Sequence, residues 1–401
     1  MLTMDKVNDA RRVLEGVVRH TDIQKAHRFT NDCLLFFKPE NLQKTGSFKV
    51  RGAAYKIAKL SEKEREKGVI ACSAGNHAQG VALAAMKNNI KSIICLPAGA
   101  PISKIEATKS YGAEVCLVPG VYDDAYKKAL ELRDEFGYTF VHPFDDEDVI
   151  AGQATIAMEA LDELPDIEAV IVPIGGGGLI SGVAYAVKNV NPKIKVYGVQ
   201  AESAPSMLNS VRDGKIETLS SVNTIADGIA VKTPGENTFR LVNEYVDDIV
   251  TISEKEICSA ILALVERQKM IAEGAGAVSV AAAMFGKLPI QGKKVLSIIS
   301  GGNIDVTNLS SVLKRGLMNA GRITSLTIEL MDKPGQLERV VDIISKSGAN
   351  IKEIRHNRAA NTDNIYSCYL NVEMETRDYE HGKEIVANLE KLNIKVIHNN
   401  D

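Results

Sequence analysis

The sequence predicts an α/β protein with mostly parallel sheets, followed by a smaller α+β unit. In the longer first part, short continuous runs of Val and Ile alternate with stretches of helical periodicity. This alternation is typical of parallel sheets that helices cover on both faces. After residue 317 the strand-like runs instead alternate apolar and polar residues, which indicates strands with one buried face.

The expected elements of the first part follow one another along the chain. A helix over residues 1 to about 20 precedes a short strand at 33–38 and a helix at 51–60. Ligands of parallel sheets bind at the carboxyl ends of strands, so functional residues are expected in the loops that follow the strands. Further strands are expected at 69–71, 92–96, 114–118, 169–173, 195–199, 248–252 and 294–299, with helices between them that include 77–87, 103–111 and 123–136.

The C-terminal part has the order βαββαβ, that of a ferredoxin-like unit. Its strands are expected around 326–330, 351–354, 366–374 and 394–397, and its helices around 337–344 and 385–392. We therefore expect a first domain over residues 1–318, with a small subdomain over about 48–145 inserted in it, and a second domain over 323–401.

Composition excludes several classes of protein. The 401 residues suffice for two or three domains, and the net charge of -3 gives no electrostatic footprint for nucleic acid. No apolar run reaches the length of a membrane span, and residues 1–20 lack the apolar core of a signal peptide. The six cysteines are scattered, which indicates reduced thiols. These features predict a soluble cytoplasmic protein.

A candidate catalytic lysine lies between Lys38 and Gly52. Lys49 stands between Phe48 and Val50, after a Thr-Gly-Ser turn. An apolar setting lowers the pKa of a lysine, because burial disfavours the ammonium form. A neutral amine can attack a carbonyl group, so Lys49 is a candidate Schiff-base lysine. On this stretch alone a surface lysine is the more frequent case, and the loops described next decide in favour of Lys49.

Two serine- and glycine-containing loops follow predicted strands. The loop Ser73-Ala74-Gly75-Asn76-His77 precedes a helix, whose free backbone N–H groups can bind a carboxylate. A plain capped turn explains the same residues equally well, and His77 is expected to be structural. The second loop, Ser300-Gly301-Gly302-Asn303, presents a serine that could reach a ligand ring, although a tight turn also accounts for it.

Four consecutive glycines, Gly175, Gly176, Gly177 and Gly178, follow the strand at 169–173. They allow the backbone to surround an anion with N–H groups, and the next helix adds its positive end. We therefore predict a phosphate site. A dinucleotide site is the weaker alternative, because G-x-G-x-x-G lacks its last glycine, although Glu202 follows the next strand where a ribose-binding acid could lie.

As a set, and in this order, these motifs resemble those of fold-type II pyridoxal-phosphate (PLP) enzymes. The resemblance is greatest to threonine dehydratases (threonine ammonia-lyases) and their serine racemase relatives, and it covers roughly residues 5 to 315. It implies a two-domain α/β fold, lyase chemistry and pyridoxal 5'-phosphate as cofactor. The motifs that carry it are Gly46–Gly52, Ser73–His77, Gly175–Gly178 and Ser300–Asn303.

The resemblance also implies a role for each site residue. Lys49 would hold PLP as a Schiff base beside Phe48, and the four glycines would bind its phosphate. Asn76 would contact the ring hydroxyl and Ser300 the pyridine nitrogen, with Glu273 near the ring. The residues implied for binding the substrate carboxylate are Ser73, Ala74, Gly75 and Asn76.

Three positions qualify the implied chemistry. A neutral Ser300 need not keep the pyridine nitrogen protonated, which suits β-elimination better than reactions that need a long-lived carbanion. Serine racemases carry a serine where this chain has Ala74, and alanine cannot exchange a proton, so racemisation should be poor. Their metal site uses an acid at the position of Leu208, six residues after the one matching Glu202, so no metal is expected here.

The Asp-Lys-Pro-Gly-Gln-Leu turn after residue 331 resembles ACT domains, which commonly bind amino acids at dimer interfaces. Threonine dehydratases form 2-oxobutanoate, which feeds the synthesis of isoleucine. Isoleucine is therefore the expected effector. Valine, a nucleotide bound elsewhere, and a purely structural dimerisation module remain alternatives. The implied effector-binding residues are Asp332, Gly335, Gln336, Leu337 and Asn350.

Together these features predict a lyase that converts L-threonine to 2-oxobutanoate and ammonia, with L-serine as a poorer substrate. We expect a homodimer or homotetramer that an amino acid regulates through the C-terminal domain. An L-serine dehydratase or serine racemase is the nearest alternative. A non-catalytic, nucleotide-binding amino-acid sensor is a more distant one.

Overall fold

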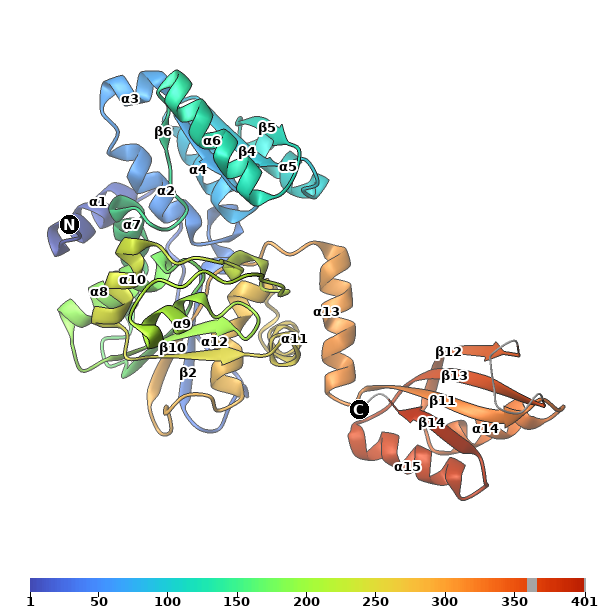
Figure 1. Cartoon of the computed structure of the whole chain (residues 1–401). Helices are drawn as coiled ribbons and strands as arrows, with labels where there is room; N and C mark the ends of the chain where they lie inside the picture. The colour runs from blue at the N-terminus through green and yellow to red at the C-terminus, as the bar shows by residue number, and fades with distance from the viewer. Residues whose placement is uncertain (359–365, 400–401) are drawn as a thin grey trace. The chain divides into compact units, whose positions relative to one another are not determined.

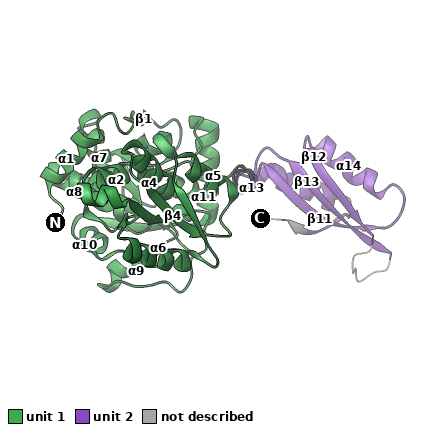
Figure 2. Cartoon of the chain, turned by 90° about the horizontal axis from the view of Figure 1, so that it is seen from above, with its two compact units in different colours: residues 1–306 green, residues 307–401 purple. Residues whose placement is uncertain are grey.

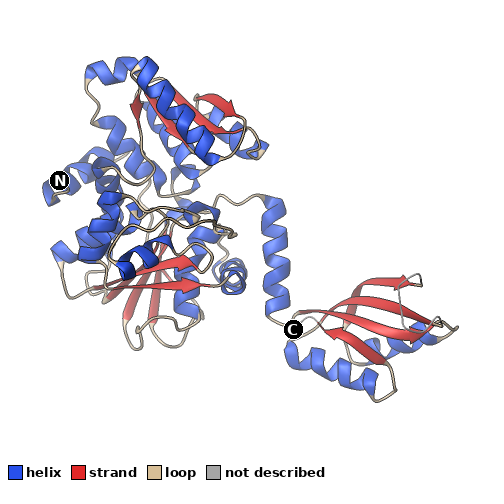
Figure 3. Cartoon of the chain, in the orientation of Figure 1, coloured by secondary structure: helices blue, strands red, loops and turns tan. Residues whose placement is uncertain are grey.

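The computed structural model describes residues 1–358 and 366–399. Two compact units, residues 1–306 and 307–401, divide the chain (Figure 2). Both sheets of the first unit are almost wholly parallel, whereas the sheet of the second unit contains antiparallel pairs (Figure 3). The prediction of an α/β part with mostly parallel sheets is therefore confirmed.

The larger sheet of the first unit has six strands in the order β1-β2-β10-β7-β8-β9. Its neighbouring strands are parallel except for β1 and β2. All five residues of β7 are buried, as expected for a central parallel strand. The strands are β1 Gln24–Lys25, β2 Leu34–Pro39, β7 Ala169–Pro173, β8 Lys195–Ala201, β9 Asp248–Ile252 and β10 Lys294–Ile299.

The smaller sheet of the first unit has the order β5-β4-β3-β6, with all pairs parallel. Figure 1 shows it as a separate layer from the larger sheet, with α2 and α7 in the region between them. The carboxyl end of β3 and that of β7 both lead into loops that line one cavity. The strands are β3 Val69–Cys72, β4 Ser92–Pro97, β5 Glu114–Val118 and β6 Thr139–Phe140.

Twelve α-helices accompany these sheets in the described part of the first unit. The most deeply buried is α12, whose Ala- and Gly-rich sequence lets it pack closely on all sides. None of the described helices is long and apolar enough to cross a membrane. The helices are α1 Met4–Leu14, α2 Lys49–Ala58, α3 Glu62–Lys67, α4 Asn76–Lys87, α5 Ile102–Ser110, α6 Tyr122–Phe136, α7 Glu147–Glu163, α8 Gly178–Val190, α9 Ser206–Asp213, α10 Glu236–Tyr245, α11 Glu254–Ala263 and α12 Gly274–Met284.

Two of these helices differ from the sequence prediction in their bounds. The first helix, expected to reach about residue 20, ends at Leu14, and Gly16 follows with a positive φ of 71° that an α-helix cannot continue. The helix expected over 51–60 begins two residues earlier and is α2, so Lys49 lies in its first turn. The candidate lysine is thus held by a helix rather than by a loop.

Close packing and a buried ion cluster fix α2 against α7. A Cβ atom on Gly152 of α7 would lie 2.6 Å from the Cα atom of Gly52, so both positions need glycine. The guanidinium of Arg51 is fully buried and donates to both carboxylate oxygens of Glu40 at 2.8 Å, and to those of Glu159 at 2.6 and 2.9 Å. Because Arg51 is only two residues from Lys49, this cluster positions the lysine's helix.

The second unit has the expected order βαββαβ after the helix α13, Val306–Asn319. Its four strands lie in the order β12-β13-β11-β14 and are antiparallel. A core of its own includes Leu326, Ile328 and Leu370. The predicted range 323–401 includes residues 359–365 and 400–401, which lie outside the described ones. The elements are β11 Ile323–Met331, α14 Gln336–Lys346, β12 Asn350–Asn357, β13 Ser367–Glu375, α15 Tyr379–Glu390 and β14 Lys395–Asn399.

Candidate active site

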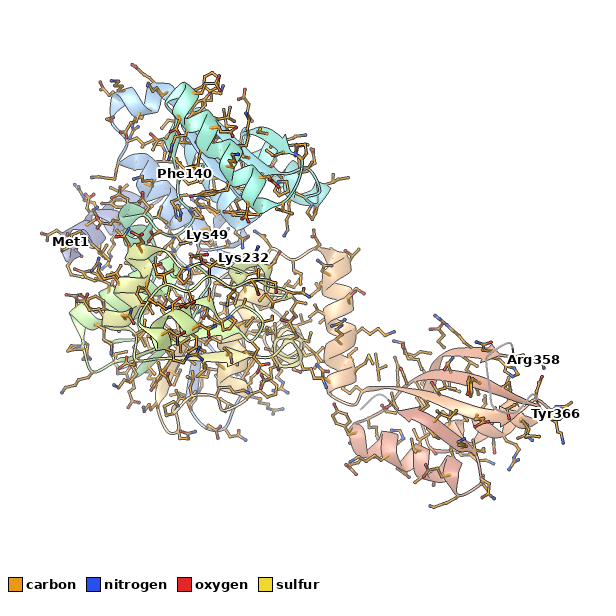
Figure 4. All side chains as sticks on the ribbon, in the orientation of Figure 1. Met1, Lys49, Phe140, Lys232, Arg358 and Tyr366 are labelled. Atoms are coloured by element: carbon orange, nitrogen blue, oxygen red, sulfur yellow. The ribbon has the colours of Figure 1, made fainter. Side chains whose placement is uncertain are left out.

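A cavity of about 970 Å³ in the first unit brings the candidate residues together. It lies at the carboxyl ends of β3, β7 and β10, as expected for ligand sites of parallel sheets. Figure 4 labels Lys49 in the region between the two sheets. The predicted site residues that line the cavity are Phe48, Lys49, Ser73, Ala74, Gly75, Asn76, Gly175, Gly176, Gly177, Gly178, Glu273 and Ser300.

Lys49 has the electrostatic environment of a reactive amine. Protein encloses its side chain at the cavity wall, and this burial lowers its pKa to about 8, although the charge of Glu273 partly opposes the shift. The Nζ atom donates a hydrogen bond of 2.7 Å to the backbone carbonyl of Pro143 and lies 5.2 Å from the centre of the Phe48 ring. Its place in the first turn of α2 acts in the same direction, since a helix N-terminus disfavours a cation. A substantial fraction of Lys49 is therefore neutral near pH 8.

Glu273 is the acidic group of the cavity. It is 4% exposed, and burial together with the nearby charge of Asp227 raises its pKa to about 8. Asn76 donates a hydrogen bond of 2.7 Å to Glu273 Oε1, and its own Oδ1 accepts one of 2.7 Å from Asn303. The carboxyl group can thus hold or release a proton near neutral pH.

The loop from Ser73 to His77 connects β3 to the N-terminus of α4. Ser73 Oγ accepts a hydrogen bond of 3.1 Å from the Gly75 N–H, and no side chain caps the helix. Free N–H groups at such a terminus favour an anion. His77 is buried and its Nε2 lies 2.8 Å from the Val141 carbonyl. Burial lowers its pKa to about 3, so His77 is neutral.

The four-glycine loop joins β7 to α8. Gly177 has a φ of 97°, and a Cβ atom there would lie 2.7 Å from Met207 and Thr238. A Cβ atom on Gly176 would lie 2.5 Å from the Phe144 ring. The loop therefore accepts only glycine, and it brings the N-terminus of α8 to the cavity.

Ser300 directly follows β10 and lines the same cavity. It is 3% exposed, and its Oγ donates a hydrogen bond of 3.2 Å to the Ala275 carbonyl. Its backbone carbonyl accepts a hydrogen bond of 3.1 Å from the N–H of Phe48, while Ser47 and Gly301 form a β-bridge. These contacts join the serine loop to the chain that carries Lys49.

This arrangement fits a phosphorylated aldehyde cofactor. Lys49 offers a half-buried amine whose pKa is lowered to about 8, and a neutral amine is what Schiff-base formation requires. The glycine loop and the N-terminus of α8 offer backbone N–H groups of the kind that hold phosphate. Ser300 offers a neutral hydroxyl that could face a ring nitrogen. These residues together could bind PLP.

Comparisons with known proteins agree with this geometry. Residues 14–301 match the family model described as pyridoxal-phosphate-dependent enzyme, and the chain belongs to this family, with a fold-type II α/β architecture. It is 49% identical over 387 residues to an L-threonine ammonia-lyase of Thermotoga maritima, covering 96% of either chain.

Two solved structures are similar over most of the chain. A processed threonine deaminase isoform 2 from Solanum lycopersicum has a TM-score of 0.75 and 37% identity, over 79% of this chain and 88% of that one. The serine racemase of maize has a TM-score of 0.74 and 35% identity, over 79% of this chain and 98% of that one. The chain is accordingly a PLP-dependent lyase.

Sequence reasoning missed several groups of the cavity. Pro143 accepts the hydrogen bond of Lys49, and Phe144 packs on the glycine loop. Both follow β6, a strand of only two residues that has no recognisable pattern. Lys104, which donates a hydrogen bond of 2.8 Å to Asp227, also lines the cavity. The one sequence signal for this position is that it follows the predicted strand at 92–96.

The residues expected to bind an effector fall into two groups within the second unit. Asp332, Gly335, Gln336 and Leu337 lie in the turn between β11 and α14 and in the first residues of α14. Asn350 begins β12 and pairs with Glu375, which pairs with Ile323 at the opposite end of β11. Eight residues of strand separate the two ends, about 27 Å. One copy of the chain therefore does not bring Asn350 to the turn.

Leu208 and Glu202, the two positions considered for a metal, lie in different elements. Leu208 is on α9 and packs against the main hydrophobic core of the first unit. Glu202 follows β8 directly. Neither belongs to the clusters of metal-ligating side chains found among the described residues.

Proposed function

We propose that this chain is a threonine ammonia-lyase, which converts L-threonine to 2-oxobutanoate and ammonia and accepts L-serine less well. The observation that carries the proposal is Lys49: a half-buried amine, with its pKa lowered to about 8, in the cavity that also holds the glycine loop and Ser300. The similarity to an L-threonine ammonia-lyase over nearly the whole chain supports this choice of substrate.

Lys49 is proposed both to hold the cofactor and to move the substrate's Cα proton. When bound, PLP supplies an electron sink conjugated with the amino group of the substrate. Lys49 would hold the cofactor through Nζ, and its free amine, which the lowered pKa leaves largely neutral, would be able to accept the proton from Cα of bound substrate. The proton thus moves from Cα to Nζ of Lys49.

Two loops with free backbone N–H groups are proposed to orient the substrate and the cofactor. We propose that the loop Ser73–Asn76, at the N-terminus of α4, binds the substrate carboxylate, and that Gly175–Gly178 bind the cofactor phosphate. Asn76 and Ser300 are proposed to contact the ring hydroxyl and the pyridine nitrogen, with Phe48 and Glu273 beside the ring. The neutral hydroxyl of Ser300 suits elimination, in which the leaving group removes the electrons promptly.

Ala74 favours elimination over racemisation. It lines the cavity on the loop proposed to bind the carboxylate, and its methyl group has no proton to exchange. A racemase needs an acid or base on each face of Cα, and Lys49 supplies only one. Serine racemase activity, the main alternative, is therefore expected to be weak.

We further propose that residues 323–401 form an ACT domain that regulates the enzyme. Its support is the βαββαβ order with four antiparallel strands and the Asp332–Leu337 turn after the first strand. Isoleucine is the proposed effector. Since Asn350 and Asp332 lie at opposite ends of the sheet, an effector that contacts both needs two copies of the chain. A homodimer or homotetramer is the expected assembly.

The first experiment compares two lysines of α2. Lys49→Ala should abolish 2-oxobutanoate formation and the absorbance of bound PLP. Lys56→Ala is the matched control, because Lys56 lies on the same helix but pairs with Asp146 and Asp148 outside the cavity. Substantial activity of the Lys49→Ala variant would exclude the assignment.

The second experiment tests substrate and effector together. We expect 2-oxobutanoate from subsaturating L-threonine, and less of it when isoleucine is added. Product formation that ignores isoleucine would keep the chemistry and exclude the effector. Absence of product from threonine, with PLP bound, would exclude the substrate, and L-serine would then be tested.

A further inference from the structure

Three metal-ligating side chains converge in the second unit, outside the catalytic cavity. Asp332 directly follows β11, His356 is the last residue but one of β12, and Cys368 is the second residue of β13. Their donor atoms all lie within 4.8 Å of one another, and His356 Nε2 is 3.0 Å from Cys368 Sγ. Figure 4 labels Arg358 and Tyr366 at this end of the sheet; His356 lies two residues before Arg358, and Cys368 two residues after Tyr366.

Strand register makes the meeting of these side chains a built-in feature of the sheet. Cys368 of β13 pairs with Leu330 of β11, and His356 of β12 pairs with Leu370 of β13. Cys368 is 1% exposed, whereas Asp332 and His356 are exposed. One ligand is therefore rigidly placed by the core, and two reach it from the surface, where an ion can enter.

The chemistry of the three donors selects the kind of ion. Thiolate and imidazole favour Zn²⁺ or a similar borderline-soft cation over Mg²⁺ or Ca²⁺, which prefer oxygen. Tetrahedral ligands at the usual zinc distances lie roughly 3.3–3.7 Å apart. The observed separations need only small side-chain movements to reach that geometry.

We propose that Asp332, His356 and Cys368 form a Zn²⁺-type site with three protein ligands and an open fourth position. The ion would join the turn after β11 to the strands β13 and β12. The other cluster among the described residues, His20 with Asp22 and Glu163, has no sulfur ligand and is exposed, and Lys38 lies 3.3 Å from Glu163. It is the weaker cation site for these reasons.

Two charges set the conditions for binding. Arg358 Nε lies 3.1 Å from Asp332 Oδ1, so the guanidinium competes with a cation for this carboxylate. Thiolate is the form of cysteine that ligates a metal ion, so binding at Cys368 releases the thiol proton.

The experiment titrates Zn²⁺ into the full-length holoenzyme, after treatment with a strong chelator, against a chromogenic chelator. We expect one tight site per chain, and proton release in calorimetry. Cys368→Ser and His356→Gln should each weaken binding at least about tenfold, since even changes outside the ligand set cost that much. Arg358→Gln should bind at least as tightly as the wild type.

Two controls separate this site from other places on the chain. Cys33→Ser, in the first unit, and His20→Gln, in the exposed cluster, should leave the tight site intact. Because His356 is exposed, His356→Gln is informative even if Cys368→Ser fails to fold. Zn²⁺ binding that is absent in the wild type, or that His356→Gln does not weaken, would overturn the proposal.

Discussion

Asn76, the first residue of α4, donates a hydrogen bond of 2.7 Å to Glu273, the residue that precedes α12. This bond joins the smaller sheet's first loop to a helix packed on the larger sheet. Asn303 extends it by donating to Asn76. The two asparagines thus hold the carboxyl group of Glu273, whose pKa is raised, in the same cavity as the amine of Lys49, whose pKa is lowered.

The first prediction concerns how the cofactor is captured. The apoenzyme should bind PLP through neutral Lys49, so the rate should rise about tenfold per pH unit below pH 8 and level off above it. The negative charge of Glu273 raises the pKa of Lys49, so Glu273→Gln should lower it and move the break to lower pH. Stopped-flow absorbance over a pH series measures the break.

The control for this prediction is Glu131→Gln, on the surface of α6, which should leave the break in place. An identical break in Glu273→Gln and the wild type would show that the two groups are not coupled.

The second prediction concerns the buried cluster behind α2. Glu40 and Arg51 are both fully buried and share two hydrogen bonds of 2.8 Å. Glu40→Gln removes one of the two carboxylates that face the buried guanidinium and leaves Glu159 as its remaining charged partner, which should destabilise the first unit by at most about 3–5 kcal/mol. Denaturant unfolding followed by a probe in the first unit measures the loss. Glu62→Gln, exposed on α3, should change stability little, and an equally small effect of Glu40→Gln would contradict the role of the cluster.

The sequence predicted the strands, their parallel pairing and the loops of the site, because each depends on a local pattern. The Val/Ile runs of β3, β7 and β10 mark buried strands, and the glycines of 175–178 mark a backbone that must approach its neighbours closely. These local patterns could not predict which side chains contact one another across the cavity. Asn76 and Glu273 are far apart in the chain, and the Lys49 contact to Pro143 depends on how two sheets pack.

The second unit shows the same limit. The alternating residues of β11 and β13 predicted the strands and their buried face. Only the register shows that Asn350 and Asp332 lie at opposite ends of the sheet, and that His356 reaches Cys368. A one-residue change of register would alter both relationships.

The third prediction concerns the contact between α2 and α7. Gly152→Ala places a Cβ atom 2.6 Å from the Cα atom of Gly52 and 2.7 Å from the Arg51 carbonyl oxygen, so the helices must move apart. We expect a loss of about 1–3 kcal/mol in stability and weaker PLP binding, because Lys49 begins α2. Equilibrium titration with PLP measures the second effect. Gly99→Ala, with no atom within 4 Å of the new Cβ, is the matched control. Unchanged PLP affinity of Gly152→Ala would show that the helix contact does not position Lys49.

The fourth prediction concerns the choice between elimination and racemisation. Ala74 lines the cavity on the loop at the N-terminus of α4. Ala74→Ser adds a hydroxyl group that can exchange a proton, so we expect D-serine formation from L-serine to rise relative to deamination. Chiral chromatography of the products gives the ratio of the two rates. Ala74→Gly changes the same position without adding a proton donor and should not raise the ratio. If Ala74→Ser and Ala74→Gly raise it equally, loop flexibility rather than proton exchange is responsible, and if neither does, Ala74 is not the residue that holds racemisation back.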